Sequence, residues 1–125
     1  MSEAPQVLVI EDNDRNMKLV RDVLQAIGYR TLESASAEEG IELAVANRPG
    51  LVLMDVQLPG LDGVAALKRL RGDARTRSLP VLALTAQAMH GDRERFLEAG
   101  FDGYLAKPVD VTELIAAVRQ ALPAS

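Results

Sequence analysis

Four apolar runs in this chain each end in residues that can bind an anion or a metal ion. In chain order, the residues that follow these runs are Glu11 with Asp12, Asp55, Thr85 and Lys107. A short apolar run bounded by turn residues is typical of a buried strand in a parallel sheet. The carboxyl ends of parallel strands share one edge of the sheet, where open α/β proteins bind their ligands. We therefore predict that these five residues meet at one edge.

The three carboxylates in this group predict a metal site. Carboxylates that converge within a few ångströms repel one another unless a cation joins them. Oxygen ligands without accompanying histidine or cysteine select Mg²⁺ or a similar ion. Glu11, Asp12 and Asp55 are therefore the candidate metal ligands, and two carboxylates with one backbone carbonyl would suffice.

Thr85 and Lys107 predict that an anion becomes attached to Asp55. A hydroxyl, an ammonium group and a divalent cation around one carboxylate form a pocket for such an anion. Aspartate is a nucleophile towards phosphoryl groups, and phosphoryl transfer requires mainly positioning and charge neutralisation. The backbone N–H groups of Val56 and Ala86 could bind the remaining oxygens. Asp55 alone could equally cap the following loop, but its four companions favour a phosphorylatable aspartate with its own Mg²⁺ site.

The elements that must position these residues follow from hydrophobic spacing. Helical spacing is plain at Met17, Val20, Leu24 and Ile27, which fall on one helix face. The predicted strands are 6–10, 29–34, 51–55, 80–84 and 101–106. The predicted helices are 14–27, 36–47, 63–71, 88–99 and one that runs from a cap at Asp110 or Thr112 to Leu122.

Local signals mark where several of these helices begin and end. Asn13 is the predicted N-cap of the first helix, and Gly28 ends it. Ser36, with Glu39 three residues later, has the pattern of a capping box. Gly100 stands where C′ glycines end helices.

Alternating strands and helices predict an α/β fold with a parallel sheet covered on both faces. Right-handed crossovers then leave chiefly a doubly wound five-stranded sheet with five helices. Spacing alone leaves the strand order open between the flavodoxin-like order 2-1-3-4-5 and other doubly wound arrangements.

The composition is that of one globular domain, which we expect to span residues 1–125 with its core at about 5–122. The chain has 125 residues, of which 48% are hydrophobic and 26% charged, an ordinary globular balance. It has no cysteine, which excludes disulfides and thiolate metal sites. No apolar run approaches the ~18 residues of a membrane helix. The net charge of −4 argues against a generic nucleic-acid binder, so we expect a cytoplasmic protein with neither nucleic-acid nor membrane partners.

Four motifs in this order resemble the receiver domain of CheY-like response regulators. They are the tandem acids Glu11-Asp12, the Met-Asp-Val-Gln-Leu-Pro-Gly run at 54–60, Leu-Thr-Ala at 84–86 and Lys107-Pro108. The resemblance covers about residues 5–122. The sequence around 11–19 and 85–92 looks closer to the DivK-like single-domain regulators, and the receiver modules of hybrid histidine kinases share much of it.

The resemblance implies a stand-alone response regulator of a two-component or phosphorelay system. Asp55 would accept a phosphoryl group from a phosphohistidine on a cognate histidine kinase or histidine phosphotransferase. Asp12, Asp55 and the backbone carbonyl of Gln57 would bind Mg²⁺, with Glu11 acting mainly through a bound water. Lys107 would pair with the phosphoryl oxygens.

The resemblance also implies how the signal would spread. The Thr85 hydroxyl would swing onto the phosphoryl group, and Tyr104 would move inward with it. The Lys107–Pro108 peptide bond would be cis, and the strand order would be 2-1-3-4-5. A downstream protein would bind the face formed by the fourth helix, the last strand and the fifth helix.

Other functions compete with this one. The leading reading is not an enzyme, because the domain would assist only its own phosphorylation and autodephosphorylation. It could instead be a phosphorelay intermediate that passes the phosphoryl group to a histidine phosphotransferase. A Mg²⁺-dependent phosphohydrolase with an aspartyl nucleophile is disfavoured, because Gln57 occupies the position where such enzymes generally need a second acid. A flavodoxin-like cofactor carrier is disfavoured because no phosphate-binding loop follows the first strand.

Overall fold

The structure is a computed structural model that describes residues 4–58, 63–86 and 92–122. Five parallel strands form one sheet in the order β2-β1-β3-β4-β5. The strands are β1 (Gln6–Ile10), β2 (Arg30–Ser34), β3 (Leu51–Asp55), β4 (Val81–Thr85) and β5 (Gly103–Ala106). The helices are α1 (Asp14–Ala26), α2 (Ala37–Asn47), α3 (Gly63–Gly72), α4 (Asp92–Ala99) and α5 (Val111–Ala121).

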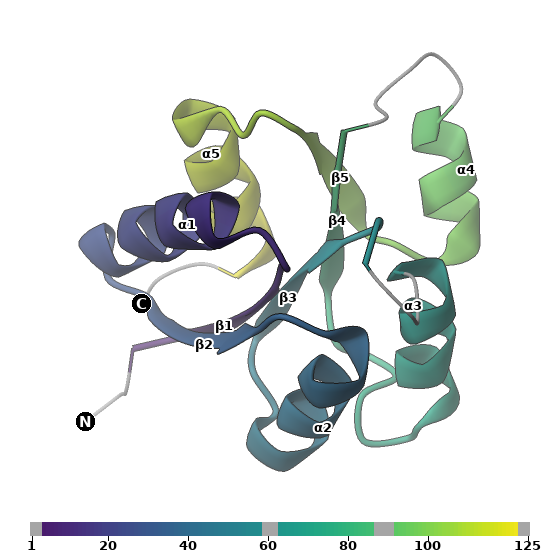
Figure 1. Cartoon of the computed structure of the whole chain (residues 1–125). Helices are drawn as coiled ribbons and strands as arrows, with labels where there is room; N and C mark the ends of the chain where they lie inside the picture. Colours follow the sequence, from purple (N-terminus) through teal and green to yellow (C-terminus); the bar gives the residue numbers. More distant parts are fainter. Residues whose placement is uncertain (1–3, 59–62, 87–91, 123–125) are drawn as a thin grey trace.

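Helices cover both faces of the sheet. Figure 1 shows α1 and α5 on one face and α2, α3 and α4 on the other. Each face has its own core, because successive residues of a strand point to opposite sides. Leu8 and Met54 pack beneath α2 and α3, whereas their neighbours Val9 and Leu53 pack beneath α1 and α5. All residues of β3 and β4 are buried, which explains why their sequences read as continuous apolar runs rather than alternating ones.

The predicted fold class and strand order are confirmed, and the element boundaries differ by one or two residues. Pro80 precedes β4, but its carbonyl still accepts a hydrogen bond from the Val52 N–H at 2.9 Å. Phe101 and Asp102 precede β5, since the Phe101 N–H donates to Phe96 and closes the turn after α4. The start of the helix predicted at 88–99 lies outside the described residues, and α4 is described from Asp92.

The predicted caps form largely as expected. The Asn13 side chain accepts the N–H groups of Arg15 and Asn16, and Asp110, rather than Thr112, caps α5. Ser36 caps α2 by accepting the Glu39 N–H at 3.2 Å. Its own N–H donates to Ser34 Oγ at 3.2 Å, so the second half of the predicted capping box is replaced by a neighbouring serine.

None of the helices within the described residues is long and apolar enough to cross a membrane.

Candidate functional site

Asp55 stands at the carboxyl end of the central strand β3 and is almost completely buried, with 3% of its surface exposed. Its Oδ1 accepts the N–H of Gln57 at 2.9 Å, and its Oδ2 accepts a hydrogen bond from Lys107 Nζ at 2.8 Å. Both carboxylate oxygens therefore accept hydrogen bonds from residues that closely follow strands β3 and β5, which presents the side chain in one defined orientation.

Gly63 allows α3 to begin directly against this strand end. A Cβ atom at position 63 would lie 2.7 Å from Val56 Cα and 2.8 Å from the Asp55 carbonyl oxygen. The Gly63 N–H donates to the Val56 carbonyl at 3.0 Å. No side chain fits between helix and strand here, so glycine is required by the close approach of two backbones. Sequence spacing did not identify this residue as part of the site.

Lys107, which follows β5, joins two carboxylates at the ends of the adjacent strands β1 and β3. Its Nζ lies 2.9 Å from Glu11 Oε2 and 2.8 Å from Asp55 Oδ2. Burial alone would lower the pKa of Lys107, but the hydrogen bonds to Asp55 and Glu11 outweigh burial and raise it. Lys107 is therefore a fully charged ammonium group at neutral pH.

Glu11 is buried at the end of β1 and accepts the Asn13 N–H at 3.1 Å. Burial raises the pKa of its carboxyl group, because desolvation of the charged form outweighs the hydrogen bond from Lys107. Glu11 Oε2 is a buried oxygen that finds no hydrogen-bond donor within the described ranges; its contact with Lys107 is an ion pair without hydrogen-bond geometry.

Asp12 completes a cluster of three acids. Ligand oxygens of Glu11, Asp12 and Asp55 all lie within 4.8 Å of one another, and Asp12 is exposed. When ionised, three carboxylates with the single ammonium of Lys107 leave two negative charges in one small volume. The donor set of hard oxygens, the residual charge and the unsatisfied Glu11 oxygen all fit a divalent cation such as Mg²⁺.

Thr85 ends β4 beside this cluster. It is buried, and its carbonyl oxygen accepts the Lys107 N–H at 2.8 Å. This bond holds the end of β5 against the end of β4. The Lys107–Pro108 peptide bond is cis, as expected. Ala86 follows Thr85 at the exposed edge of the site.

One backbone donor differs from the expectation. The Val56 N–H donates to the Leu84 carbonyl at 3.0 Å, because the ladder between β3 and β4 continues one residue past Asp55. In this structure that N–H belongs to the sheet rather than to an anion pocket. The next N–H, that of Gln57, instead points at Asp55; the direction of the Gln57 carbonyl remains a prediction.

Tyr104 lies on β5, half-buried, and packs against the core on the α4 side. Its ring centroid is 6.3 Å from that of Phe96 on α4. The structure therefore connects Tyr104 to α4 through an aromatic contact that sequence spacing did not identify.

A surface hollow of about 450 Å³ adjoins the site between α3 and α4. Val56 and Gln57, which directly follow Asp55, form one wall, and Val64, Arg95 and Phe96 are among the residues of the others. Of these, only Gln57 and Val56 carried a signal in the sequence, through their distance from Asp55.

Comparisons with known proteins agree with this geometry. Residues 7–119 match the response regulator receiver domain family. The chain is 42% identical to the polar-differentiation response regulator DivK of Brucella anthropi over 116 residues, which are 93% of this chain and 94% of that protein. The same identity is found with DivK of Brucella ovis.

Solved structures show the same fold. A response regulator structure from Chloroflexus aurantiacus superposes with a TM-score of 0.90 at 36% identity, over 97% of this chain and 98% of that one. The receiver domain of a sensor histidine kinase from Pseudomonas aeruginosa, described with a magnesium ion coordinated in its active-site cleft, gives a TM-score of 0.85 at 36% identity and covers 95% of this chain and 97% of that one. The match over most of the chain shows that this protein belongs to the response regulator receiver family of two-component signalling.

Proposed function

We propose that this receiver domain takes a phosphoryl group onto Asp55 from a phosphohistidine of a histidine kinase or histidine phosphotransferase. The observation that carries the proposal is the charge arrangement around Asp55. Its carboxylate lies 2.8 Å from the Lys107 ammonium, within a cluster whose other two acids leave the site with excess negative charge.

The chemistry requires one bond to form and one to break. An oxygen of the Asp55 carboxylate forms the O–P bond while the P–N bond of phosphohistidine breaks, and the electron pair of that bond returns to the imidazole nitrogen. Lys107 stays protonated throughout and pairs with the oxygens of the transferred group. The N–H of Gln57 orients the carboxylate before transfer, since it already donates to Oδ1.

Glu11, Asp12, Asp55 and the Gln57 carbonyl would hold Mg²⁺, and Glu11 would act mainly through a bound water. When bound, the cation would offset the charge that three acids and a phosphoryl group bring together. The magnesium ion described in the active-site cleft of the Pseudomonas aeruginosa receiver domain supports this assignment.

Phosphorylation would then act as a switch on protein binding. The Thr85 hydroxyl would turn towards a group on Asp55, and the position of the two residues at the ends of adjacent strands supports this role. Its neighbouring strand carries Tyr104, which contacts Phe96 of α4. A movement of Thr85 would therefore be transmitted through Tyr104 and Phe96 to the face made by α4, β5 and α5, where Leu97 is exposed. A downstream protein would bind there.

Intact-mass spectrometry tests the proposal. The protein is incubated with Mg²⁺ and phosphoramidate, and Asp55→Asn is compared with the control Asp14→Asn, which changes an exposed acid in the first turn of α1. We expect one phosphoryl adduct per chain on the wild type and the control, and none on Asp55→Asn. An adduct that persists on Asp55→Asn would refute Asp55 as the acceptor.

A chain that takes no phosphoryl group from phosphoramidate is then offered a phosphorylated histidine kinase. Transfer that depends on Asp55 would retain the proposal with kinase-specific chemistry. Continued turnover of an aryl phosphate by the wild type would instead indicate a hydrolase.

A further inference from the structure

Arg71, at the end of α3, binds four acceptors that lie outside its own helix. Its guanidinium group donates to the carbonyl oxygens of Arg77 at 3.0 Å and of Leu79, both in the segment before β4. It also donates to the Gly100 carbonyl and to Asp102 Oδ2, each at 3.0 Å, in the segment between α4 and β5. We call these four bonds the Arg71 clasp.

Asp102 extends the clasp to the start of two strands. Its Oδ2 also accepts the Val81 N–H at 2.8 Å, and its own N–H donates to the Val81 carbonyl at 2.8 Å. Val81 is the first residue of β4, and Asp102 directly precedes β5. Asp102 therefore sets the register at which β5 enters the sheet, two residues before Tyr104.

Gly100 places the C-terminal end of α4 within the same clasp. It has a φ of +113°, which ends the helix, and the Phe101 N–H then donates to the Phe96 carbonyl at 3.1 Å. A Cβ atom at Gly100 would lie 3.4 Å from the Leu67 side chain of α3. The end of α4 thus lies close to α3, and the bond from Arg71 holds it there.

Phe96, in the body of α4, makes aromatic contacts, which are less directional than hydrogen bonds. Phe96 packs edge-on against Phe101, with ring centroids 6.0 Å apart, and at a tilt against Tyr104. Leu97 is 41% exposed. Directional hydrogen bonds resist displacement more sharply than such contacts do, so the bond from Arg71 to Gly100 fixes the C-terminal end of α4 more firmly than the ring contacts fix Phe96.

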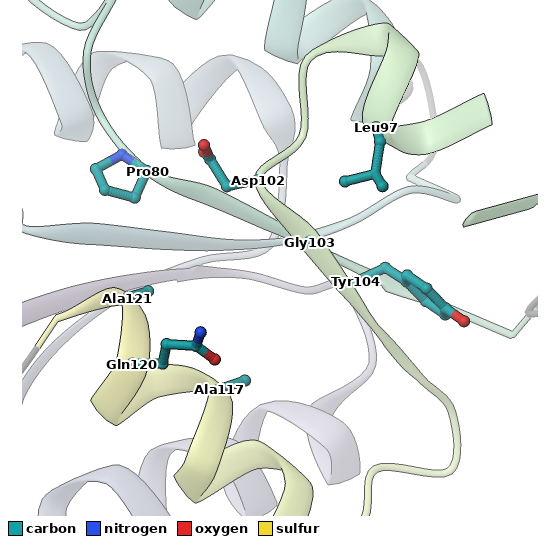
Figure 2. A pocket seen from close by; sticks show the side chains of 8 residues that line it. All are labelled: Pro80, Leu97, Asp102, Gly103, Tyr104, Ala117, Gln120 and Ala121. Atoms are coloured by element: carbon teal, nitrogen blue, oxygen red, sulfur yellow. The ribbon is translucent and has the colours of Figure 1, made fainter. Parts of the chain in front are cut away.

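A surface hollow of about 520 Å³ spans this boundary. Figure 2 shows Pro80 and Asp102 on one side of β5 and Leu97 and Tyr104 on the other, with α5 below them. Asp102 of the clasp therefore lies on one side of the hollow, and Leu97 of α4 lies on the other.

We propose that Arg71 is a positioning residue for the switch, and that the clasp is the pivot about which α4 moves when Asp55 is phosphorylated. The inference rests on the proposed function of Asp55. Movement of α4 about this pivot would shift Leu97 relative to Asp102 and α5 and change the contact between Phe96 and Tyr104, and so reshape the hollow. Lysine could not replace Arg71, because only a guanidinium group presents several donors in a rigid plane.

Residue-resolved amide hydrogen exchange, with Mg²⁺ and beryllium fluoride as a phosphoryl mimic, tests the pivot. In the wild type we expect exchange at Phe96 and Tyr104 to change by about tenfold, and exchange at Gly100, Phe101 and Asp102 by less than about twofold. In Arg71→Lys the change should spread to residues 100–102, while the rate of adduct formation with phosphoramidate stays within about twofold of the wild type.

Two further variants separate the pivot from general stability. Asp102→Asn keeps an oxygen for the Val81 N–H but loses the ion pair, and it should reproduce the spread seen with Arg71→Lys. Arg69→Met changes an exposed arginine in the last turn of the same helix, and it should keep the wild-type pattern.

Three results would overturn the pivot. Residues 100–102 of the wild type could respond as strongly as Phe96, or Arg71→Lys could keep the wild-type pattern despite lower stability. In both cases the amides of Val56 and Gln57, next to Asp55, would still respond, and the proposed function would stand. If those amides did not respond either, the proposed function would fail and the pivot with it.

Discussion

At the scale of single residues, Glu11 is a buried carboxyl group whose ionised form is disfavoured by burial and favoured by its ion pair with Lys107. Glu11 is buried, and the pKa of its carboxyl group is raised because desolvation outweighs the hydrogen bond from Lys107. The folded state without metal therefore binds a proton at Glu11 more tightly than the unfolded chain does. Its ionised form costs stability as the pH rises through the folded pKa.

Replacing Glu11 by Gln should stabilise the metal-free protein at neutral pH. The expected gain is on the order of 1 kcal/mol, the usual scale of a single substitution, because the uncharged amide avoids the desolvation cost and can still accept the Asn13 N–H. Urea unfolding at pH 7 with a chelator measures it. Metal-free Glu11→Gln with clearly lower stability than the wild type would show that the ion pair with Lys107 outweighs burial.

Asp73 makes a pH-dependent contribution of the opposite sign. The side-chain hydrogen bond from Arg75, followed by the Arg75 N–H, lowers the pKa of Asp73 from 3.8 to about 2. Because the pKa of Asp73 is lower in the folded protein than in the unfolded chain, the ionised carboxylate stabilises the fold at pH values above the unfolded pKa. This contribution disappears as the pH falls from about 4 to about 2.

The stability difference between wild type and Asp73→Asn should therefore be constant above about pH 5 and shrink towards pH 2. Unfolding curves over that pH range measure the difference. A difference that does not change with pH would mean that Asp73 acts through shape, since its Oδ1 also accepts a backbone N–H, and not through charge.

Glycine positions decide how closely elements approach one another. Gly63 lets α3 start against the end of β3, where an added Cβ would meet the backbone at 2.7 Å. Gly72 ends the same helix with nothing within 4 Å of such a Cβ. The two positions therefore form a matched pair within one element.

Gly63→Ala should cost about 1–3 kcal/mol, the range for overpacking a rigid contact, and slow adduct formation, because the clash displaces the backbone of Asp55 and Val56. Gly72→Ala should be neutral or slightly stabilising, since alanine restricts the unfolded chain more than glycine does. Urea unfolding and phosphoramidate labelling of both variants check this. Equal effects of the two substitutions would contradict the close approach at Gly63.

The strands and helices were largely predictable from the sequence, because each apolar run and each set of apolar residues at helical spacing is a local signal. Asn13, Gly28 and Gly100 mark helix ends through their own chemistry, and the structure has them there. The strand order was not predictable from spacing, because a crossover of similar length can place a strand on either side; it came from the resemblance to receiver domains.

Contacts between distant segments carried no local signal. The partners of Arg71 lie up to 31 positions away, and three of them are backbone carbonyls, which every residue has. The hydrogen bond from the Val56 N–H to the Leu84 carbonyl was not predictable for the same reason, since it depends on how far the ladder between β3 and β4 continues. The meeting of the five candidate site residues at one edge of the sheet was predictable, because parallel strands bring their carboxyl ends together whatever lies between them.

At the scale of the whole molecule, the sheet separates chemistry from structural support. The acids and Lys107 lie at the carboxyl edge, whereas Asp102 and Val81 of the clasp lie where β4 and β5 begin. Metal binding at the first edge should therefore stabilise the whole fold without changing the contacts at the second.

Millimolar Mg²⁺ should raise the free energy of unfolding by about 1.4 kcal/mol at a concentration ten times the dissociation constant, because the ion binds only the folded cluster. This corresponds to a rise in Tm on the order of 5 °C for a domain of this size.

Asp12→Asn should fold normally, since Asp12 is exposed, yet lose most of the stability gained from Mg²⁺. NaCl at matched ionic strength should not replace Mg²⁺, because screening acts on all surface charges alike. Thermal unfolding in Mg²⁺, in NaCl and with a chelator measures these effects. Equal Tm values under all three conditions would contradict the metal site, because they would show that the three clustered carboxylates need no cation.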